Sequence, residues 1–267
     1  MKAKTEELLY LLLWTCDMLA CPTFRNLTGS FEEWAYRNGL GRQLAELERQ
    51  KLLESRHPGG QSPRNLDRVL RLTEAGRVHA LGGQDPEVRW RRHWDGRWRL
   101  VLFDLPNAQS KLRDRLRTQL RRLRFGWLQN SVWISPDPID TDKAGMAGSS
   151  ADVESLILLE ARPCAGESDE QIVAGAWDFQ KINRLYSEHG RVLAARPSGS
   201  LGDQTAAKTF RKWATQERLS WLAAITEDPL LPESLLPAGY LGQEAWRKRL
   251  KALRSVGALV REFKVEA

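Results

Sequence analysis

Residues 98–136 have the sequence WRLVLFDLPNAQSKLRDRLRTQLRRLRFGWLQNSVWISP, which changes twice between two hydrophobic periods. The run WRLVLFDL is rich in aromatic and branched residues and stops at Pro106, as expected of a buried strand. Leucines then recur at spacings of four, four and three residues, which places Leu112, Leu116, Leu120 and Leu123 on one helical face. We expect Gly126 to end this helix, and FGWLQNSVWIS to form the next strand. The order strand, helix, strand indicates an α+β domain.

The expected helix in this stretch is strongly basic. It carries one acid, Asp114, beside Lys111, Arg113, Arg115, Arg117, Arg121, Arg122 and Arg124. A strip of this kind attracts polyanions such as nucleic acid. An equally simple interpretation is that long basic side chains solvate an amphipathic helix and cover its apolar stripe with their stems. Charge alone leaves both interpretations open.

The composition bounds the class of protein. The chain has 267 residues, 42% of them hydrophobic, which is enough for two or three packed domains. Its 41 Lys and Arg outnumber 34 Asp and Glu, giving a net charge of +7. This balance favours phosphate-bearing partners, with nucleic acid first and an acidic small molecule second.

Cysteine usage and the apolar runs predict a cytoplasmic protein with no membrane segment. Cys16, Cys21 and Cys164 are too few and too scattered for a disulfide framework or a zinc site. The apolar run LLYLLLW at 8–14 is faintly similar to an export signal, but acids flank it. We expect it to be a first helix buried in its own domain.

The N-terminal part, residues 1–82, has the pattern of a winged helix-turn-helix. Helices are expected at 5–20, at 31–37 after a capping box that starts at Ser30, and at 42–55. A hairpin follows, with a short strand after Lys51, a turn at 57–63 and a second strand at 68–73, and Thr73 caps a further helix. In such folds the third helix enters the major groove and the wing meets phosphate. The candidate DNA-binding residues are Arg42, Gln43, Arg49 and Lys51 on the helix and Arg56, Arg64 and Arg68 on the wing.

An alternative for this domain stays open. Glu46 and Glu48 dilute the charge of the expected recognition helix, and a winged helix can also serve protein contacts.

Two further domains are expected. The N-terminal domain is expected to end near Gly82-Gly83 and Asp85-Pro86. Residues 88–176 then have the pattern of a ferredoxin-like domain, with a strand at 155–162 and a second helix at 169–177. We expect this domain to carry homodimerisation, because a small winged helix needs a partner to present two half-sites. Residues 177–267 are expected to form a helical domain of three long helices, at 177–189, 204–225 and 242–263.

Three blocks of the chain resemble the PaaX-like bacterial transcription regulators, named for the repressor of phenylacetate breakdown. They are WDGRWRLVLFDLP at 94–106, FGWLQNSVWISP at 125–136 and DPLLPESLLPAGYLGQEA at 228–245. The resemblance implies a dimer with a winged-helix domain, a ferredoxin-like domain and a helical domain. It also implies release from a DNA operator by an aryl-CoA thioester. Arg122, Arg124 and Trp127 are the candidate effector-binding residues.

The chain departs from this family's pattern at two places. The wing SRHPGGQSPRNLDRV lacks a compact Arg-Gly-Arg pattern, and Tyr240 stands where Trp is usual. These departures bear on which operator sequence and which effector the protein binds, and less on its fold.

A competing resemblance is to an enzyme. A strand followed by Asp104 and an Arg-rich helix is also similar to the small ferredoxin-fold subunit of the CRISPR adaptation complex, in which two copies bring their aspartates to one divalent cation. Asp104 precedes Leu-Pro-Asn, however, where a turn acceptor is the usual role of an Asp.

Other signs of enzyme chemistry are missing from the sequence. No HExxH, GxSxG, P-loop or GxGxxG is present, so no enzyme activity and no cofactor are expected. Trp94, Trp98, Trp127 and Trp133 are expected to be core residues.

Overall fold

The computed structural model describes residues 23–24, 41–56, 69–80, 85–105, 110–139, 156–197 and 204–262. Its contacts divide the chain into two compact units. The first consists of residues 1–85, 186–223 and 242–267, and the second of 86–185 and 224–241. This division is not the same as the predicted domains 1–82, 88–176 and 177–267. It groups residues 1–85 with most of the helical region, extends the central unit to residue 185 and adds the segment 224–241 to that unit.

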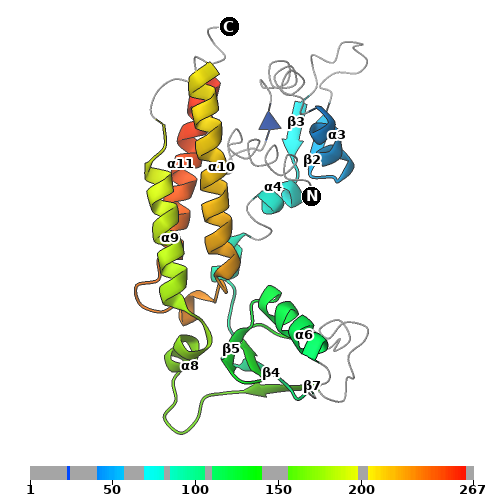
Figure 1. The fold of residues 1–267 in the computed structure, drawn as a ribbon, viewed down its shortest axis with the longest axis vertical. Coiled ribbons are helices and arrows are strands. Elements are labelled where there is room, and N and C mark those ends of the chain that lie inside the picture. Colours follow the sequence, from blue (N-terminus) through cyan, green and yellow to red (C-terminus); the bar gives the residue numbers. More distant parts are fainter. Residues whose placement is uncertain are drawn as a thin grey trace. The chain divides into compact units, whose positions relative to one another are not determined.

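The second unit is built on an antiparallel sheet of four strands, which confirms the α+β class (Figure 1). Its elements are α5 (Pro86–Trp90), β4 (Trp98–Phe103), α6 (Ser110–Arg122), β5 (Gly126–Gln129), β6 (Val132–Ser135), β7 (Leu156–Ala161) and α8 (Asp169–Ala176). The strands lie in the order β5-β6-β4-β7. The single strand expected at 125–135 is in fact a hairpin, because the chain turns at Asn130, whose φ is +45°.

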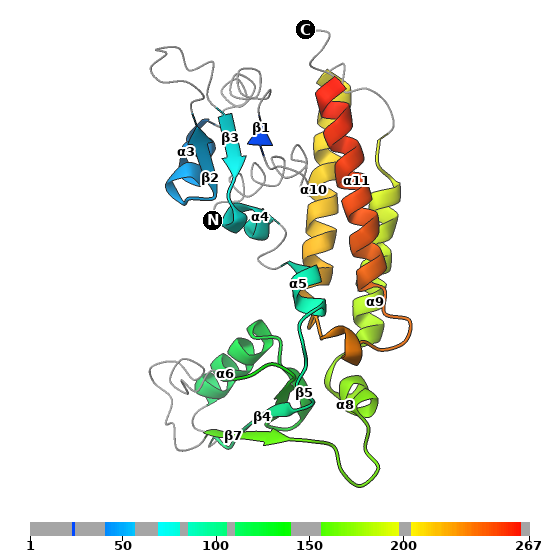
Figure 2. The same ribbon diagram turned by 180° about the vertical axis from the view of Figure 1, so that it is seen from behind.

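Helices α6 and α8 cover opposite faces of this sheet (Figure 2). Alternate residues of β4 divide between the faces: Val101 and Phe103 pack with Leu116 and Leu120 of α6. Trp98, with 1% of its surface exposed, packs on the other face with residues of α8 and of the segment 224–241. Burying each of these large side chains stabilises the fold by roughly 1.5–3 kcal/mol. In a ferredoxin-like order the second helix precedes the last strand, whereas α8 follows β7.

The end of α6 differs from the expectation in its details. The helix stops at Arg122, the chain turns through Arg124 with φ +66°, and Gly126 begins β5 instead of ending the helix. Leu123 therefore lies beyond the apolar face and is 44% exposed. Trp127 is 54% exposed and is not a core residue, whereas Trp98 and Trp133 are buried as predicted.

Gly126 has a packing role. A Cβ there would stand 2.6 Å from Cε2 of Trp177 and 2.7 Å from Cβ of Ala176. Only glycine lets α8 approach β5 this closely.

Three long helices confirm the helical C-terminal region: α9 (Phe179–Ala194), α10 (Gln204–Glu227) and α11 (Gly242–Glu262). Within the first unit they pack through Tyr186, Trp213, Trp221, Trp246 and Leu253, all at most 5% exposed. The 3-10 turn η4 (Glu233–Leu235) belongs to the connection between α10 and α11. No helix in the described ranges is both long and apolar enough to span a bilayer.

The N-terminal residues that are described form a small α/β arrangement. It consists of β1 (Thr23–Phe24), α3 (Gly41–Arg49), β2 (Leu53–Arg56), β3 (Val69–Leu72) and α4 (Glu74–Ala80), with the sheet order β1-β3-β2. Thr73 caps α4 as predicted, since its Oγ1 accepts from Gly76 N at 3.0 Å. Helix α3 ends at Arg49, earlier than Ser55, because Lys51 adopts φ +56° and β2 begins two residues later. The first two predicted helices, 5–20 and 31–37, lie outside the described residues.

Candidate functional site

Helix α3 presents two arginines on its exposed face. Leu44 and Leu47 point inward at 4% and 0% exposure, while Arg42 and Arg49 are exposed and Gln43 is half-buried. Positions 42 and 49 are seven residues apart, so they share one side of the helix, about 10 Å apart along its axis. This is the face that could enter a groove.

The two arginines differ in their surroundings. Glu46 accepts hydrogen bonds from Arg49 Nη2 at 2.6 Å and from Nε at 2.9 Å, and this carboxylate raises the pKa of Arg49. Arg49 is thus held against an acid on its own helix. Arg42 is in no ion pair with any residue in the described ranges, which makes it the better candidate for a base contact.

The remaining DNA-binding candidates are placed only in part. Lys51 is exposed in the turn that follows α3. Arg56 closes β2, and the wing residues Arg64 and Arg68 lie outside the described residues.

The three candidate effector residues lie near one another in sequence but have different surroundings. Arg122 is exposed at the end of α6. Nη1 of Arg124 donates to the carbonyl of Ile225 at 2.9 Å and to that of Asp228. The Trp127 indole donates to the carbonyl of Asn130 at 3.0 Å. Arg124 therefore anchors the segment 224–241, a function that its place in a basic run did not reveal.

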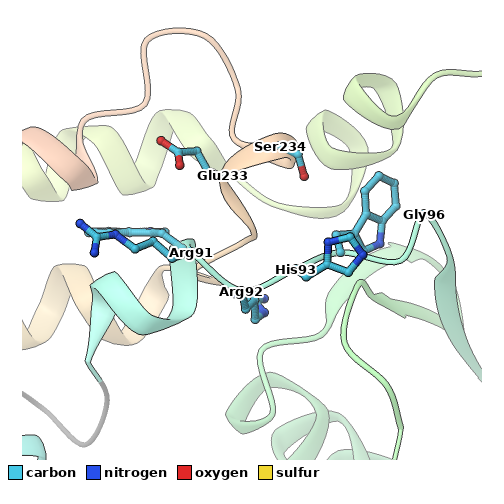
Figure 3. A pocket seen from close by; sticks show the side chains of 8 residues that line it. Arg91, Arg92, His93, Gly96, Glu233 and Ser234 are labelled. Atoms are coloured by element: carbon cyan, nitrogen blue, oxygen red, sulfur yellow. The ribbon is translucent and has the colours of Figure 1, made fainter.

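A hollow of about 480 Å³ lies in the second unit, between the end of α5 and η4. Its lining residues are Trp90, Arg91, Arg92, His93, Trp94, Gly96, Glu233 and Ser234. Figure 3 shows Glu233 and Ser234 across from the stretch that carries Arg91, Arg92 and His93. None of Arg122, Arg124 and Trp127 lines this hollow.

Arg92 is a structural residue of the hollow's wall. Its Nε donates to Oδ1 of Asp137 at 2.5 Å, and its Nη1 donates to the carbonyl of Leu230. Burial lowers the pKa of Arg92, and Asp137 opposes this effect. Arg89 also donates to Asp137, at 2.6 Å. Arg92 thus links the Asp137 carboxylate to the segment 224–241.

The block DPLLPESLLPAGYLG at 228–242 is organised by a fully buried carboxylate. Asp228 accepts hydrogen bonds from Leu230 N at 2.8 Å and from the Tyr240 hydroxyl. The Tyr240 ring stands edge-on to Trp90 at 6.2 Å and to Phe179 at 5.8 Å. The Tyr240 hydroxyl and the Leu230 amide thus supply hydrogen bonds to a carboxylate that is buried.

A second buried polar cluster, in the helical bundle, was not predicted. Oε1 of Glu217 accepts from Nε of Arg249 at 2.8 Å and lies 2.9 Å from Nε2 of His189, and all three residues are fully buried. The Arg249 guanidinium lies 4.6 Å from the Trp221 ring centroid. Burial lowers the pKa of His189 to about 3, with Arg249 as a second cause, so the imidazole is neutral.

Asp104 is exposed just after β4. In the described part of the chain, no group of three or more His, Cys, Asp or Glu side chains is placed to hold a metal ion. The nuclease alternative takes one carboxylate from each of two copies, so a single chain does not test it.

Comparison with known proteins adds to these observations. Residues 91–173 match the family model described as the PaaX protein central Cas2-like domain. The chain is 27% identical over 186 residues to the transcriptional repressor PaaX of Escherichia coli strain K12, a match that covers 67% of this chain and 56% of that protein. The chain thus spans little more than half the length of this relative.

A solved structure supports the fold. The uncharacterized protein Rv0674 from Mycobacterium tuberculosis superposes with a TM-score of 0.56 at 20% identity, covering 98% of this chain and 100% of the other. At this identity the likeness concerns the fold alone.

Proposed function

We propose that this PaaX-like protein is a transcriptional repressor that binds double-stranded DNA as a homodimer. The observation that carries the proposal is the match to a relative named as a transcriptional repressor, together with the family match over the central domain. The exposed arginine face of α3 and the net charge of +7 agree with a DNA partner.

The N-terminal residues support a winged helix-turn-helix as the DNA-binding part. Helix α3 is followed directly by the hairpin β2-β3, and β1 pairs with the outer side of β3. In a winged helix the last helix before the hairpin is the one that reads bases. In this proposal Arg42 and Gln43 meet base edges, and Lys51, Arg56, Arg64 and Arg68 meet phosphate.

The test uses the full chain and duplexes from the region upstream of the operon beside its own gene. Wild-type protein should shift one duplex specifically, and Arg42→Ala should weaken that binding by about 1–3 kcal/mol while relaxing base preference. Arg191→Ala, which removes an exposed arginine of α9, serves as the matched control. If the two substitutions weakened DNA binding equally, α3 would not be the helix that contacts the bases.

The signal that releases DNA is proposed to be a small anionic effector such as an aryl-CoA thioester. Arg122 is exposed and could meet its phosphates, and the half-exposed Trp127 could stack on an aromatic acyl group. Arg124 would act indirectly, through the carbonyls of the segment that it anchors. A panel of CoA thioesters should contain one that raises both the melting temperature of the protein and its Kd for the operator. A panel without such a compound would contradict the effector proposal and leave the DNA proposal standing.

A further inference from the structure

We propose that helix α6 is a second DNA-contact surface, which binds the phosphate backbone of a duplex without reading its bases. The inference rests on the proposed function, because it assumes a DNA-binding protein. It adds a contact outside the N-terminal region, on the opposite side of α6 from the central sheet.

Five of the six basic residues of α6 fall into two groups that the sequence could not separate, and the sixth, Arg117, is half-buried. Arg113 donates to the carbonyl of Leu105, and the guanidinium of Arg121 lies 5.6 Å from the Trp133 ring centroid. These two side chains are used within the fold. Lys111, Arg115 and Arg122 are exposed and in no ion pair with any residue that the structure describes.

The three exposed cations form one ridge. At 100° per residue, positions 111, 115 and 122 lie within about 40° of one another around the helix, and they span about 17 Å along its axis. Leu116 and Leu120, which pack on the sheet, point to the other side at 4% and 0% exposure. The aliphatic stems of the ridge residues therefore do not cover the apolar stripe. Covering that stripe was the main reason to interpret these cations as solvating side chains only, and it does not apply at these three positions.

Charge on this ridge contrasts with that of four arginines from α5 to β4 in the same unit. Arg89, Arg92, Arg97 and Arg99 all form ion pairs with carboxylates at 2.5–2.7 Å. On α6 the only acid is Asp114, which is exposed and forms no ion pair among the described residues. The ridge thus keeps its positive charge for an external anion.

The shape of the ridge selects the kind of anion. A small anionic ligand needs a concave site that surrounds it, and Lys111 and Arg115 lie on the convex outer side of the helix. Arg122, the last residue of α6, is the one ridge residue that the effector proposal also uses. Single-stranded nucleic acid is usually held by aromatic side chains that stack on bases, and no ridge position is aromatic. A duplex offers a phosphate charge every ~1.7 Å of its axis, so cations spread over ~17 Å can meet several phosphates at once.

The experiment compares two triple variants of the full chain with equal loss of charge. Lys111→Gln/Arg115→Gln/Arg122→Gln removes the ridge, and Arg162→Gln/Arg184→Gln/Arg191→Gln removes three exposed arginines elsewhere. Kd is measured without effector, as a function of salt, for the operator duplex and for an unrelated duplex of equal length. Melting temperature and sedimentation confirm that both variants are folded and assembled like the wild type.

We expect the ridge variant to bind both duplexes about tenfold or more weakly, with an unchanged ratio between them. Its slope of log Kd against log salt should fall by about 2–3, because each lost phosphate contact removes roughly 0.9. Arg115→Gln alone should lower the slope by roughly 0.9, and the control triple should leave it unchanged.

Operator binding and slope equal to those of the control triple would overturn this inference while leaving the repressor proposal intact. A wild-type protein that binds no duplex would overturn both.

Discussion

The guanidinium Nε of Arg249 donates to Oε1 of Glu217 across 2.8 Å, and both side chains are fully buried in the helical bundle. A buried ion pair contributes little net stability, but loss of one member leaves the other charge in a medium of low dielectric constant. Loss of one partner alone is therefore expected to cost more stability than the intact pair contributes.

The first prediction follows from this asymmetry. Arg249→Met should destabilise the fold by about 3–5 kcal/mol, since it leaves the Glu217 carboxylate without its cation. The double variant Glu217→Leu/Arg249→Met should recover most of this loss, because both buried charges are then absent. Chemical denaturation measures both effects. Arg247→Met, at an exposed position two residues before Arg249, is the control and should change stability by less than about 0.5 kcal/mol. A double variant as unstable as the single one would contradict the account.

A second prediction concerns pH and His189. Burial holds the folded-state pKa of His189 at about 3, below the ordinary value of 6.5 for histidine, so the unfolded chain binds more protons between these two values. Stability from this residue is fully present above pH 6.5 and is lost as the pH falls towards 3. Acidification from pH 7 to 5 should lower the free energy of unfolding of the wild type by about 2 kcal/mol more than that of His189→Gln.

Glu217 and Arg249, which face His189, also affect how stability depends on pH. Burial raises the pKa of Glu217, and Arg249 opposes this effect. Since both residues remain in His189→Gln, the difference between the two proteins isolates the imidazole. Parallel stability curves over pH 5–7 would contradict a neutral buried histidine.

Sequence reasoning succeeded where structure is set by local periodicity. The strand at 98–103, the helix at 110–122 and the strand at 156–161 all follow from patterns within a few residues. The strand expected at 125–135 was wrong as a single element, because both halves are apolar and only the left-handed turn at Asn130 divides them.

What sequence reasoning missed depends on contacts between distant parts of the chain. Arg124 looks like one more surface cation, yet it bonds to carbonyls 101 and 104 residues away. His189, Glu217 and Arg249 come from three different helices, and no spacing between them signals a cluster. One general rule could have pointed to this cluster: a single charged residue on the apolar face of a helix needs a partner. Arg249 is such a residue, because it lies between Trp246 and Leu253, which are buried.

A third prediction tests the packing of α8 on the sheet. Gly126→Ala should destabilise the second unit by about 1–3 kcal/mol, because the new Cβ would overlap Trp177 and Ala176. Gly175→Ala, in α8 itself, has nothing within 4 Å of the added Cβ and should stabilise by about 0.5–1 kcal/mol. Melting temperatures should therefore move in opposite directions for the two glycines. Similar shifts of the same sign would mean that α8 does not pack at Gly126.

A fourth prediction concerns assembly. The full chain should sediment as a homodimer at micromolar concentration, because two half-sites of an operator require two copies of the DNA-binding part. Arg42→Ala should leave the dimer intact while weakening DNA binding, since Arg42 is exposed on α3. A chain that stays monomeric at tens of micromolar, with or without operator DNA, would remove the dimer from the proposal.

The last prediction separates a repressor from a nuclease at Asp104. This carboxylate is exposed where β4 ends, and the nuclease alternative would need it and its copy in a second chain to hold a divalent cation. Asp104→Asn keeps the size and one acceptor oxygen of the side chain but removes the charge that a hard cation requires. We expect no cleavage of DNA or RNA by wild-type protein with Mg²⁺ or Mn²⁺, and operator binding by Asp104→Asn within about 1 kcal/mol of wild type, the size of one hydrogen bond. Asp114→Asn, an exposed acid of α6, is the matched control for loss of one negative charge. Cleavage that needs metal, disappears in Asp104→Asn and survives in Asp114→Asn would replace the repressor proposal with the nuclease.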